Sequence, residues 1–263
     1  MTGGSSGWAA FRDGLALAVG TLTVLRVRGP RSIDASRAAV AMSIAPLAIL
    51  PAGALLAAIG AGLDLIALPA LVTAAAVIAA SVLVTRALHV DGLADTVDGL
   101  TASYDRERAL TVMRTGDVGP SGTAAVVLVL GIQMFAVADL LTRDHGWAAV
   151  ALAWCCARVA LPLMCVRGSP SARPVGLGAT VAGAVPVVAL VTVTVAAMIG
   201  MAGVGLLVDR PWWQGIAALT AGLLAVAALL LRCRSRLGGI TGDVLGAGVE
   251  ICSAILLAGL SAG

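Results

Sequence analysis

The sequence predicts an all-α fold, a polytopic bundle of transmembrane helices that forms a single integral membrane domain over residues 1–263. The chain is 60% hydrophobic and only 12% charged, and its mean hydropathy of +1.03 lies far from the balance of a water-soluble domain. The apolar residues form long continuous runs instead of the alternating pattern of a membrane β-barrel. A soluble fold and a barrel are therefore excluded.

Each transmembrane helix needs about 20 mostly apolar residues. Seven runs meet this requirement, near residues 38–62, 65–86, 119–141, 147–166, 178–207, 212–231 and 244–262. The stretch 8–25 holds too short an uninterrupted apolar run after Asp13, so we predict an interfacial or re-entrant helix there. A cleaved signal peptide is the alternative, but no small-residue cleavage site precedes Arg26 and the downstream spans would remain unexplained.

The arginines predict the orientation of the helices, since the chain contains no lysine. If the N-terminus is cytoplasmic, the inner segments also include residues 87–118, 167–177 and 232–243. All arginines except Arg143, Arg158 and Arg210 then lie inside or at the inner boundary, as the positive-inside rule requires. We therefore expect a multi-pass protein whose chemistry faces the cytoplasm.

Arg158 is an ionisable residue within the fourth predicted span, where burying a charge is costly. Glu250 in the seventh span is its candidate counter-charge. The two residues either fix the packing of the helices or take part in function, and the sequence alone leaves both interpretations open.

Three carboxylates in the longest inner segment predict a metal site. Asp91, Asp95 and Asp98 are spaced i, i+4, i+7, so on a helix they occupy about 60° of one face. Crowded carboxylates repel one another unless a cation neutralises them, and hard oxygen ligands suit Mg²⁺. A solvated acidic face is the alternative, which we disfavour because the cluster adjoins a membrane span in a chain with few acids.

Two glycine-rich segments, residues 113–122 and 237–247, each lead into a predicted span. Glycines allow close approach of a ligand, and the first amides of a helix can receive an anion. Because Mg²⁺ usually keeps positions for substrate phosphates, a diphosphate substrate is implied. Helix packing is the alternative role for the glycines. The candidate substrate-binding residues in these segments are Arg114, Asp117, Gly239, Thr241 and Asp243.

Taken together, these motifs resemble the cobalamin synthase family, adenosylcobinamide-GDP ribazoletransferase. The matching segments occur in order along the chain: residues 89–99, residues 113–122, Arg158 with residues 173–178, and residues 237–247 with Glu250. The resemblance implies a Mg²⁺-dependent transferase of the bacterial inner membrane. Its partners would be the lipid bilayer and two small molecules, adenosylcobinamide-GDP and α-ribazole or its 5′-phosphate, with no nucleic acid. The products would be adenosylcobalamin, or its phosphate, and GMP.

One position departs from the family pattern. The family more often has Asp directly after the basic residue at position 114, where this chain has Thr115, and Asp117 follows two residues later. Either Asp117 takes over that carboxylate's role or the position is not a ligand.

The resemblance and the spacing together suggest a role for each residue. Asp91 and Asp95 would hold Mg²⁺ on the diphosphate, while Asp98 either completes the metal site or acts as the catalytic base. His89 lies on the opposite face of the predicted helix and ranks below Asp98 as the base. Arg114 and Arg158 are candidate phosphate ligands because of the bidentate guanidinium group.

Two other functions fit the sequence less well. A CDP-alcohol phosphotransferase of lipid synthesis also uses clustered aspartates, but its signature has an Ala-Arg pair where Ala94 is followed here by Asp95. A transporter would bind its substrate near the bilayer midplane between interrupted helices. The acids of this chain cluster in an inner segment instead.

Overall fold

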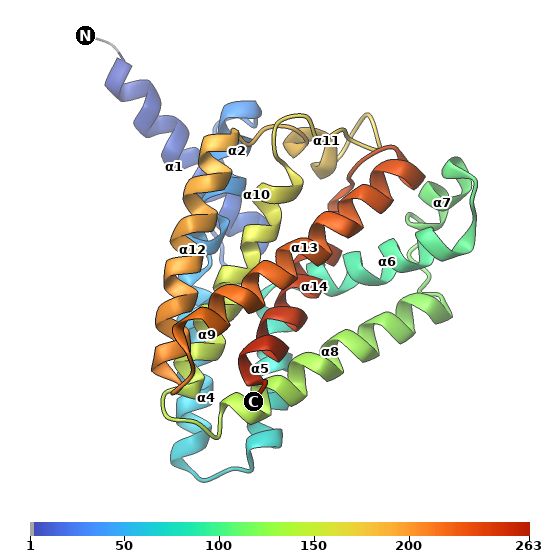
Figure 1. Cartoon of the computed structure of the whole chain (residues 1–263). Helices are drawn as coiled ribbons and strands as arrows, with labels where there is room; N and C mark the ends of the chain where they lie inside the picture. The colour runs from blue at the N-terminus through green and yellow to red at the C-terminus, as the bar shows by residue number, and fades with distance from the viewer. Residues whose placement is uncertain (1–2) are drawn as a thin grey trace.

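The computed structural model describes residues 3–263, and every secondary-structure element named within this range is helical (Figure 1). The predicted all-α class is confirmed. In chain order the helices are α1 (Gly3–Leu22), α2 (Ala35–Ser43), α3 (Ala45–Ala48), α4 (Leu50–Leu65), α5 (Ala70–Val84), α6 (Leu88–Ala102), α7 (Arg106–Val112), α8 (Pro120–Leu140), α9 (Gly146–Cys156), the 3₁₀ turn η1 (Ala157–Val159), α10 (Ala160–Met164), α11 (Leu177–Val181), α12 (Val187–Leu207), α13 (Trp212–Leu237) and α14 (Gly242–Ser261).

Within residues 3–263, five helical stretches are long and apolar enough to cross a membrane. They are α8, the continuous stretch Gly146–Met164, α12, α13 and α14, and they correspond to the last five predicted spans. The fifth predicted span, residues 178–207, begins later than expected, because α11 is a separate short helix and Pro186 precedes α12. The chain is therefore a multi-pass helical bundle, with five spans recognised by length and composition.

The first two predicted spans are interrupted. Residues 38–62 are divided among α2, α3 and α4, and the breaks coincide with Pro46 and Pro51, each in the first turn of its helix. Proline is tolerated there because the missing N–H has no acceptor within the helix. The second predicted span, residues 65–86, corresponds to α5, which is separated from α6 by a bend of 86°. The two helices make a sixth span only if they are counted together as one.

The α5–α6 bend turns the acidic helix away from the direction of the preceding span. Arg86 and Ala87 both adopt the left-handed conformation, with φ of 56° and 57°. Side chains rarely adopt this region, so the surrounding packing must hold the two residues there. Asp91, Asp95 and Asp98 then follow on α6, which is helical as their spacing required.

The core of the bundle surrounds α14. Within the most apolar stretch of this helix 72% of the residues are buried, against 17% for the peripheral α12. Figure 1 shows α14 between α13, α6 and α8. The N-terminal α1 packs on α2, where Arg37 bonds to Asp13 at 3.1 Å. Helix α1 is not among the candidate spans, and its interfacial or re-entrant position stays a prediction.

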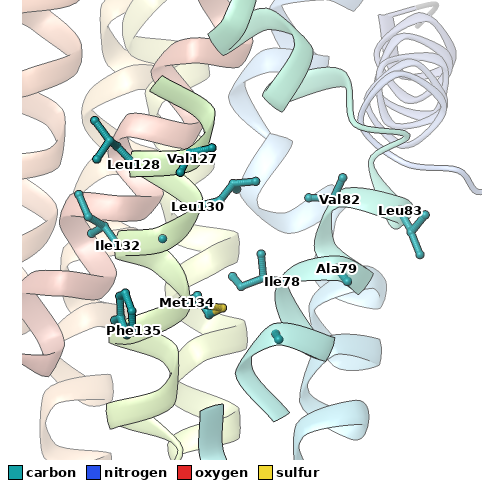
Figure 2. Close-up of a pocket in the computed structure, with 12 residues that line it drawn as sticks. Ile78, Ala79, Val82, Leu83, Val127, Leu128, Leu130, Ile132, Met134 and Phe135 are labelled. Atoms are coloured by element: carbon teal, nitrogen blue, oxygen red, sulfur yellow. The ribbon is translucent and has the colours of Figure 1, made fainter. Parts of the chain in front are cut away.

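A groove of about 880 Å³ lies between α5 and α8 (Figure 2). Every residue that lines it is apolar, including Ile78, Val82, Met134 and Phe135. The groove belongs to a membrane-spanning helix of the bundle and holds no group that could bind a phosphate or move a proton. It is therefore not the site of the chemistry.

Candidate active site

Helices α6 and α14 cross at close range through two glycines. A Cβ atom on Gly92 would lie 2.6 Å from the carbonyl oxygen of Asp243, and one on Gly246 would lie 3.0 Å from Cα of His89. Larger residues at either position would force the helices apart. This crossing brings Asp91, on α6, to the same cavity as Asp243, in the first turn of α14.

The turn that joins α13 to α14 depends on two further glycines. Gly238 ends α13 with φ of 82°, and Gly239 has φ of 157° at a point where a Cβ would overlap the carbonyl of Pro170. Thr241 is the N-cap of α14, since its Oγ1 accepts from the amide of Val244 at 3.2 Å. Gly239 and Thr241, both predicted to bind substrate, thus have local backbone roles in shaping the site.

Arg173 is the basic residue that the fold brings to the acidic cluster. Its loop is fixed by two backbone hydrogen bonds, from Ala172 to Ile240 and from Ile240 to Pro170, both 2.9 Å. Its guanidinium donates to Leu110 O at 3.1 Å and lies 3.5 Å from the Asp243 carboxylate. Sequence reasoning gave Arg173 no role of its own, although it lies in one of the family-like segments.

These residues border a cavity of about 240 Å³. Its ionisable lining residues are His89, Asp91, Arg173 and Asp243. Thr21 and Leu22, at the end of α1, line it as well. The N-terminal helix therefore completes a wall of the site, which no motif in the sequence had suggested.

The cavity region carries an excess of negative charge. Burial raises the pKa of Asp95 to about 6, and the nearby carboxylates of Asp91, Asp243 and Asp98 add to the shift while Arg173 opposes it. A cation with a preference for oxygen ligands would relieve this repulsion. The chemistry of Asp91, Asp95 and Asp243 thus fits a hard divalent ion.

Asp98 differs from the other two aspartates of α6. Its Oδ2 accepts from the amide of Gly119 at 2.7 Å and its Oδ1 from the amide of Gly122 at 2.8 Å. Either glycine would overlap this carboxylate if it carried a Cβ. Asp98 therefore joins the N-terminus of α8 to α6 through both carboxylate oxygens.

The expected grouping of Asp91, Asp95 and Asp98 around one metal is accordingly not formed. Across residues 3–263, no group of three or more His, Cys, Asp or Glu side chains is arranged to hold a metal ion. The physical reason at Asp98 is its engagement with two backbone amides of α8.

Arg114 and Asp117 lie on the exposed connection between α7 and α8. The side chain of neither residue makes a hydrogen bond or an ion pair within the described chain. The pKa of Arg173 is lowered, first by burial and also by the nearby charge of Arg114, while the carboxylate of Asp243 opposes the shift. Arg114 therefore lies close to Arg173. Both side chains are free to meet a ligand.

A second polar group lies deep in the bundle. Arg158 is 1% exposed; it stacks on the ring of Trp154 at 3.6 Å and donates to that residue's carbonyl at 2.5 Å. Glu250 accepts from Gln133 at 2.7 Å, and its other oxygen lies 4.0 Å from Nδ1 of His89. Arg158 forms no ion pair within 4.0 Å of any acid in residues 3–263, and it does not line the cavity.

His89 connects the buried group to the cavity. Its ring is buried, and neither nitrogen has a hydrogen-bond partner in the described structure. The sequence predicted that His89 lies on the helix face opposite the aspartates. In the structure His89 packs against α14 and also lines the cavity. Gln133 was missed, although a polar residue within an apolar span is itself a signal of function or packing.

Comparisons with known proteins identify the family of the chain. The family model described as cobalamin-5-phosphate synthase matches residues 14–261. An adenosylcobinamide-GDP ribazoletransferase of a Nocardioides species is 44% identical, with 94% of this chain and 97% of the relative aligned. Proteins of the same name from Frankia casuarinae and Syntrophobacter fumaroxidans are 38% and 33% identical, over 90% and 95% of this chain and 90% and 97% of the relatives.

No solved structure matches the chain. The family match nevertheless covers α6, the loop of Arg173 and the first turn of α14, which together form the acidic cavity. The chain belongs to the cobalamin-5-phosphate synthase family.

Proposed function

We propose that this protein is an adenosylcobinamide-GDP ribazoletransferase, which joins adenosylcobinamide-GDP to α-ribazole or its 5′-phosphate and releases GMP. The names of its relatives support this activity. The observation that carries the proposal is the cavity where Asp91 and Asp243 lie beside Arg173. Clustered carboxylates and a guanidinium are groups suited to a metal-bound diphosphate.

The reaction is the attack of a ribose hydroxyl on the phosphorus that remains attached to the corrinoid. A new P–O bond forms, the P–O bond of the anhydride breaks, and GMP leaves with the bonding electrons while the hydroxyl loses its proton. Catalysis of such a transfer depends mainly on alignment and on neutralisation of phosphate charge. The protein must therefore supply a rigid site that binds the diphosphate and neutralises its charge, and a proton acceptor for the attacking hydroxyl.

We infer that one or two of the carboxylates of Asp91, Asp95 and Asp243 would bind Mg²⁺, with phosphate oxygens of the substrate as further ligands, so no set of three acids has to be assembled in advance. The ion when bound would neutralise the diphosphate. The raised pKa of Asp95, caused first by burial and then by the neighbouring carboxylates, supports this set. Arg173 is already beside Asp243, and the free guanidinium of Arg114 lies on the adjacent connection. These two arginines would bind phosphate oxygens through their paired donors.

Burial and the charge of Arg158 lower the pKa of His89 to about 3, so its imidazole is neutral at pH 7, and we propose it as the proton acceptor in place of Asp98. Both oxygens of Asp98 already accept backbone amides, so a proton on that carboxylate would cost the contact with α8. His89 lines the cavity and has two nitrogens without partners. This assignment reverses the ranking that the spacing had suggested, and it makes Asp98 a positioning residue.

We also propose that the cavity faces the cytoplasm from the bacterial inner membrane. Arg106, Arg173 and Arg236 all make contacts around the α6–α7 end of the bundle. Arg143 and Arg210 lie instead on the α8–α9 and α12–α13 connections, at the other ends of their helices. The arginine distribution thus supports the orientation expected from the positive-inside rule.

The direct test is GMP release by the purified protein in lipid nanodiscs. Adenosylcobinamide-GDP and α-ribazole, supplied with Mg²⁺, should yield GMP together with the cobalamin product, and Asp91→Asn should abolish both. A parallel reaction with CDP-activated substrates and lipid alcohols tests the alternative phosphotransferase. No GMP from the corrinoid substrate, or turnover only with lipid alcohols, would overturn the proposal.

A further inference from the structure

The N-terminal segment forms a second cavity that the proposed chemistry does not use. It has a volume of about 400 Å³ and lies between α1 and the segment that follows it. Its lining combines three arginines with apolar side chains: Arg12, Arg28, Arg31, Leu15, Val19 and Val27. A site with these two kinds of lining suits a ligand that has both an anionic and a hydrocarbon part.

The arginines leave positive charge available in this cavity. Asp13 is the acid in its lining, and Asp13 is already paired with Arg37 of α2 at 3.1 Å and with Arg12 at 3.4 Å. The guanidinium groups of Arg28 and Arg31 make no hydrogen bond or ion pair within residues 3–263. Two bidentate donors are thus free to bind the oxygens of a phosphate.

The surface around the cavity is suited to the membrane interface. Trp8 and Phe11 stack with ring centroids 5.8 Å apart, and with Leu15 they follow the i, i+3, i+7 spacing of one helix face. Trp8 is 69% exposed. Figure 1 shows the first half of α1 extending away from the bundle. Exposed aromatic residues beside arginines are typical of a helix that lies in the headgroup region.

We propose that this cavity binds an anionic phospholipid. Arg28 and Arg31 would bind the phosphate, and the start of an acyl chain would follow Leu15, Val19 and Val27. The apolar lining favours a lipid over a soluble phosphate, which would leave these side chains without a partner. The groove of Figure 2 differs in this respect, because its lining carries no charge to hold a headgroup.

The test compares lipid binding by three forms of the full-length protein in detergent. Phosphatidylglycerol or phosphatidylcholine is added, and bound lipid is counted by native mass spectrometry. The wild type should retain phosphatidylglycerol in preference, and R28Q/R31Q should lower its occupancy about tenfold. The matched control is R232Q/R234Q, which removes two exposed arginines at the end of α13. That control should bind phosphatidylglycerol as the wild type does.

Three results would overturn the proposal. Equal losses in the two double variants would mean that the lipid is attracted only by overall charge. Displacement of the lipid by glycerol 3-phosphate would identify a site for soluble phosphates. Unchanged binding in R28Q/R31Q would exclude the cavity. R28K/R31K, which keeps the charge but loses the bidentate group, should retain intermediate binding, and equal unfolding temperatures establish that all variants are folded.

Discussion

The three aspartates of α6 illustrate what residue spacing can and cannot predict. Their i, i+4, i+7 pattern correctly indicated a helix with the carboxylates on one side. It could not reveal that Asp98 accepts two amides from α8, because that contact joins residues more than 20 positions apart and depends on how two helices pack. The three residues therefore differ in expected effect when each is changed.

Asp91→Asn and Asp95→Asn should abolish turnover and leave the protein folded, since each removes a ligand charge and no packing contact. Asp98→Asn should instead destabilise the protein by about 1–3 kcal/mol, because both amides lose a charged acceptor and one of them then faces an NH2 donor. Unfolding temperatures and GMP release, measured on the same purified variants, separate the two effects. An Asp98→Asn protein with wild-type stability and no activity would return Asp98 to the chemistry.

The pKa of Asp95 predicts how metal binding depends on pH. Burial and the adjacent carboxylates raise this pKa to about 6, so Asp95 is neutral below that pH and charged above it. A ligand carboxylate must be deprotonated, so the affinity for Mg²⁺ should be constant above pH 7 and fall up to about tenfold per unit below 6. Calorimetric titration across this range is the measurement. Asp95→Asn should bind weakly at every pH, and a steep dependence that survives in this variant would assign the titration elsewhere.

Asp117 allows a clean test of the departure from the family pattern. The N-cap of α8 is Gly119, and the side chain of Asp117 makes no hydrogen bond or ion pair in the described chain. A loss of activity on removing its charge would therefore not come from helix capping. We expect Asp117→Asn to lower turnover as much as Asp95→Asn does. Adding Thr115→Asp to the Asp117→Asn variant should restore turnover. A near-normal rate for Asp117→Asn would show that this carboxylate is not used.

At the scale of helices, hydropathy and proline positions predicted some breaks but not others. Pro46 and Pro51 gave a sequence signal for the division of the first span. The 86° bend after α5 has no glycine or proline at its centre, where Arg86 and Ala87 are left-handed. Such a conformation is imposed by tertiary packing, so local sequence could not reveal it.

The glycine crossing of α6 and α14 should be sensitive to a single methyl group. In Gly92→Ala the new Cβ would lie 2.6 Å from the Asp243 carbonyl, and moving the helices apart should cost about 1–3 kcal/mol. Turnover should fall with stability because Asp91 and Asp243 separate. Gly131→Ala in α8 is the matched control, since nothing lies within 4 Å of its added Cβ. Similar unfolding temperatures for the two variants would contradict the close approach.

For the whole molecule, the sequence predicted the class of fold better than the assembly of the site. Continuous apolar runs were sufficient to identify the last five spans, because each is a local property of the chain. The cavity instead depends on α1, α6, the Arg173 loop and α14 meeting in space. The family-like segments marked most of these elements but not α1. Its contribution follows only from the packing of the described chain.

The orientation of the whole bundle can be tested with two engineered cysteines. Ser103, beyond α6, and Ser261, at the end of α14, should lie on opposite sides of the membrane if the arginine-rich end is cytoplasmic. In sealed cells a membrane-impermeant thiol reagent should label Ser261→Cys and not Ser103→Cys, while permeabilisation should expose both. The unmodified protein is the background control, because four of its five cysteines are buried and Cys156 is partly buried. Labelling of Ser103→Cys alone in sealed cells would show that the orientation is the reverse of the predicted one. The cavity of Asp91 and Asp243 would then face outward.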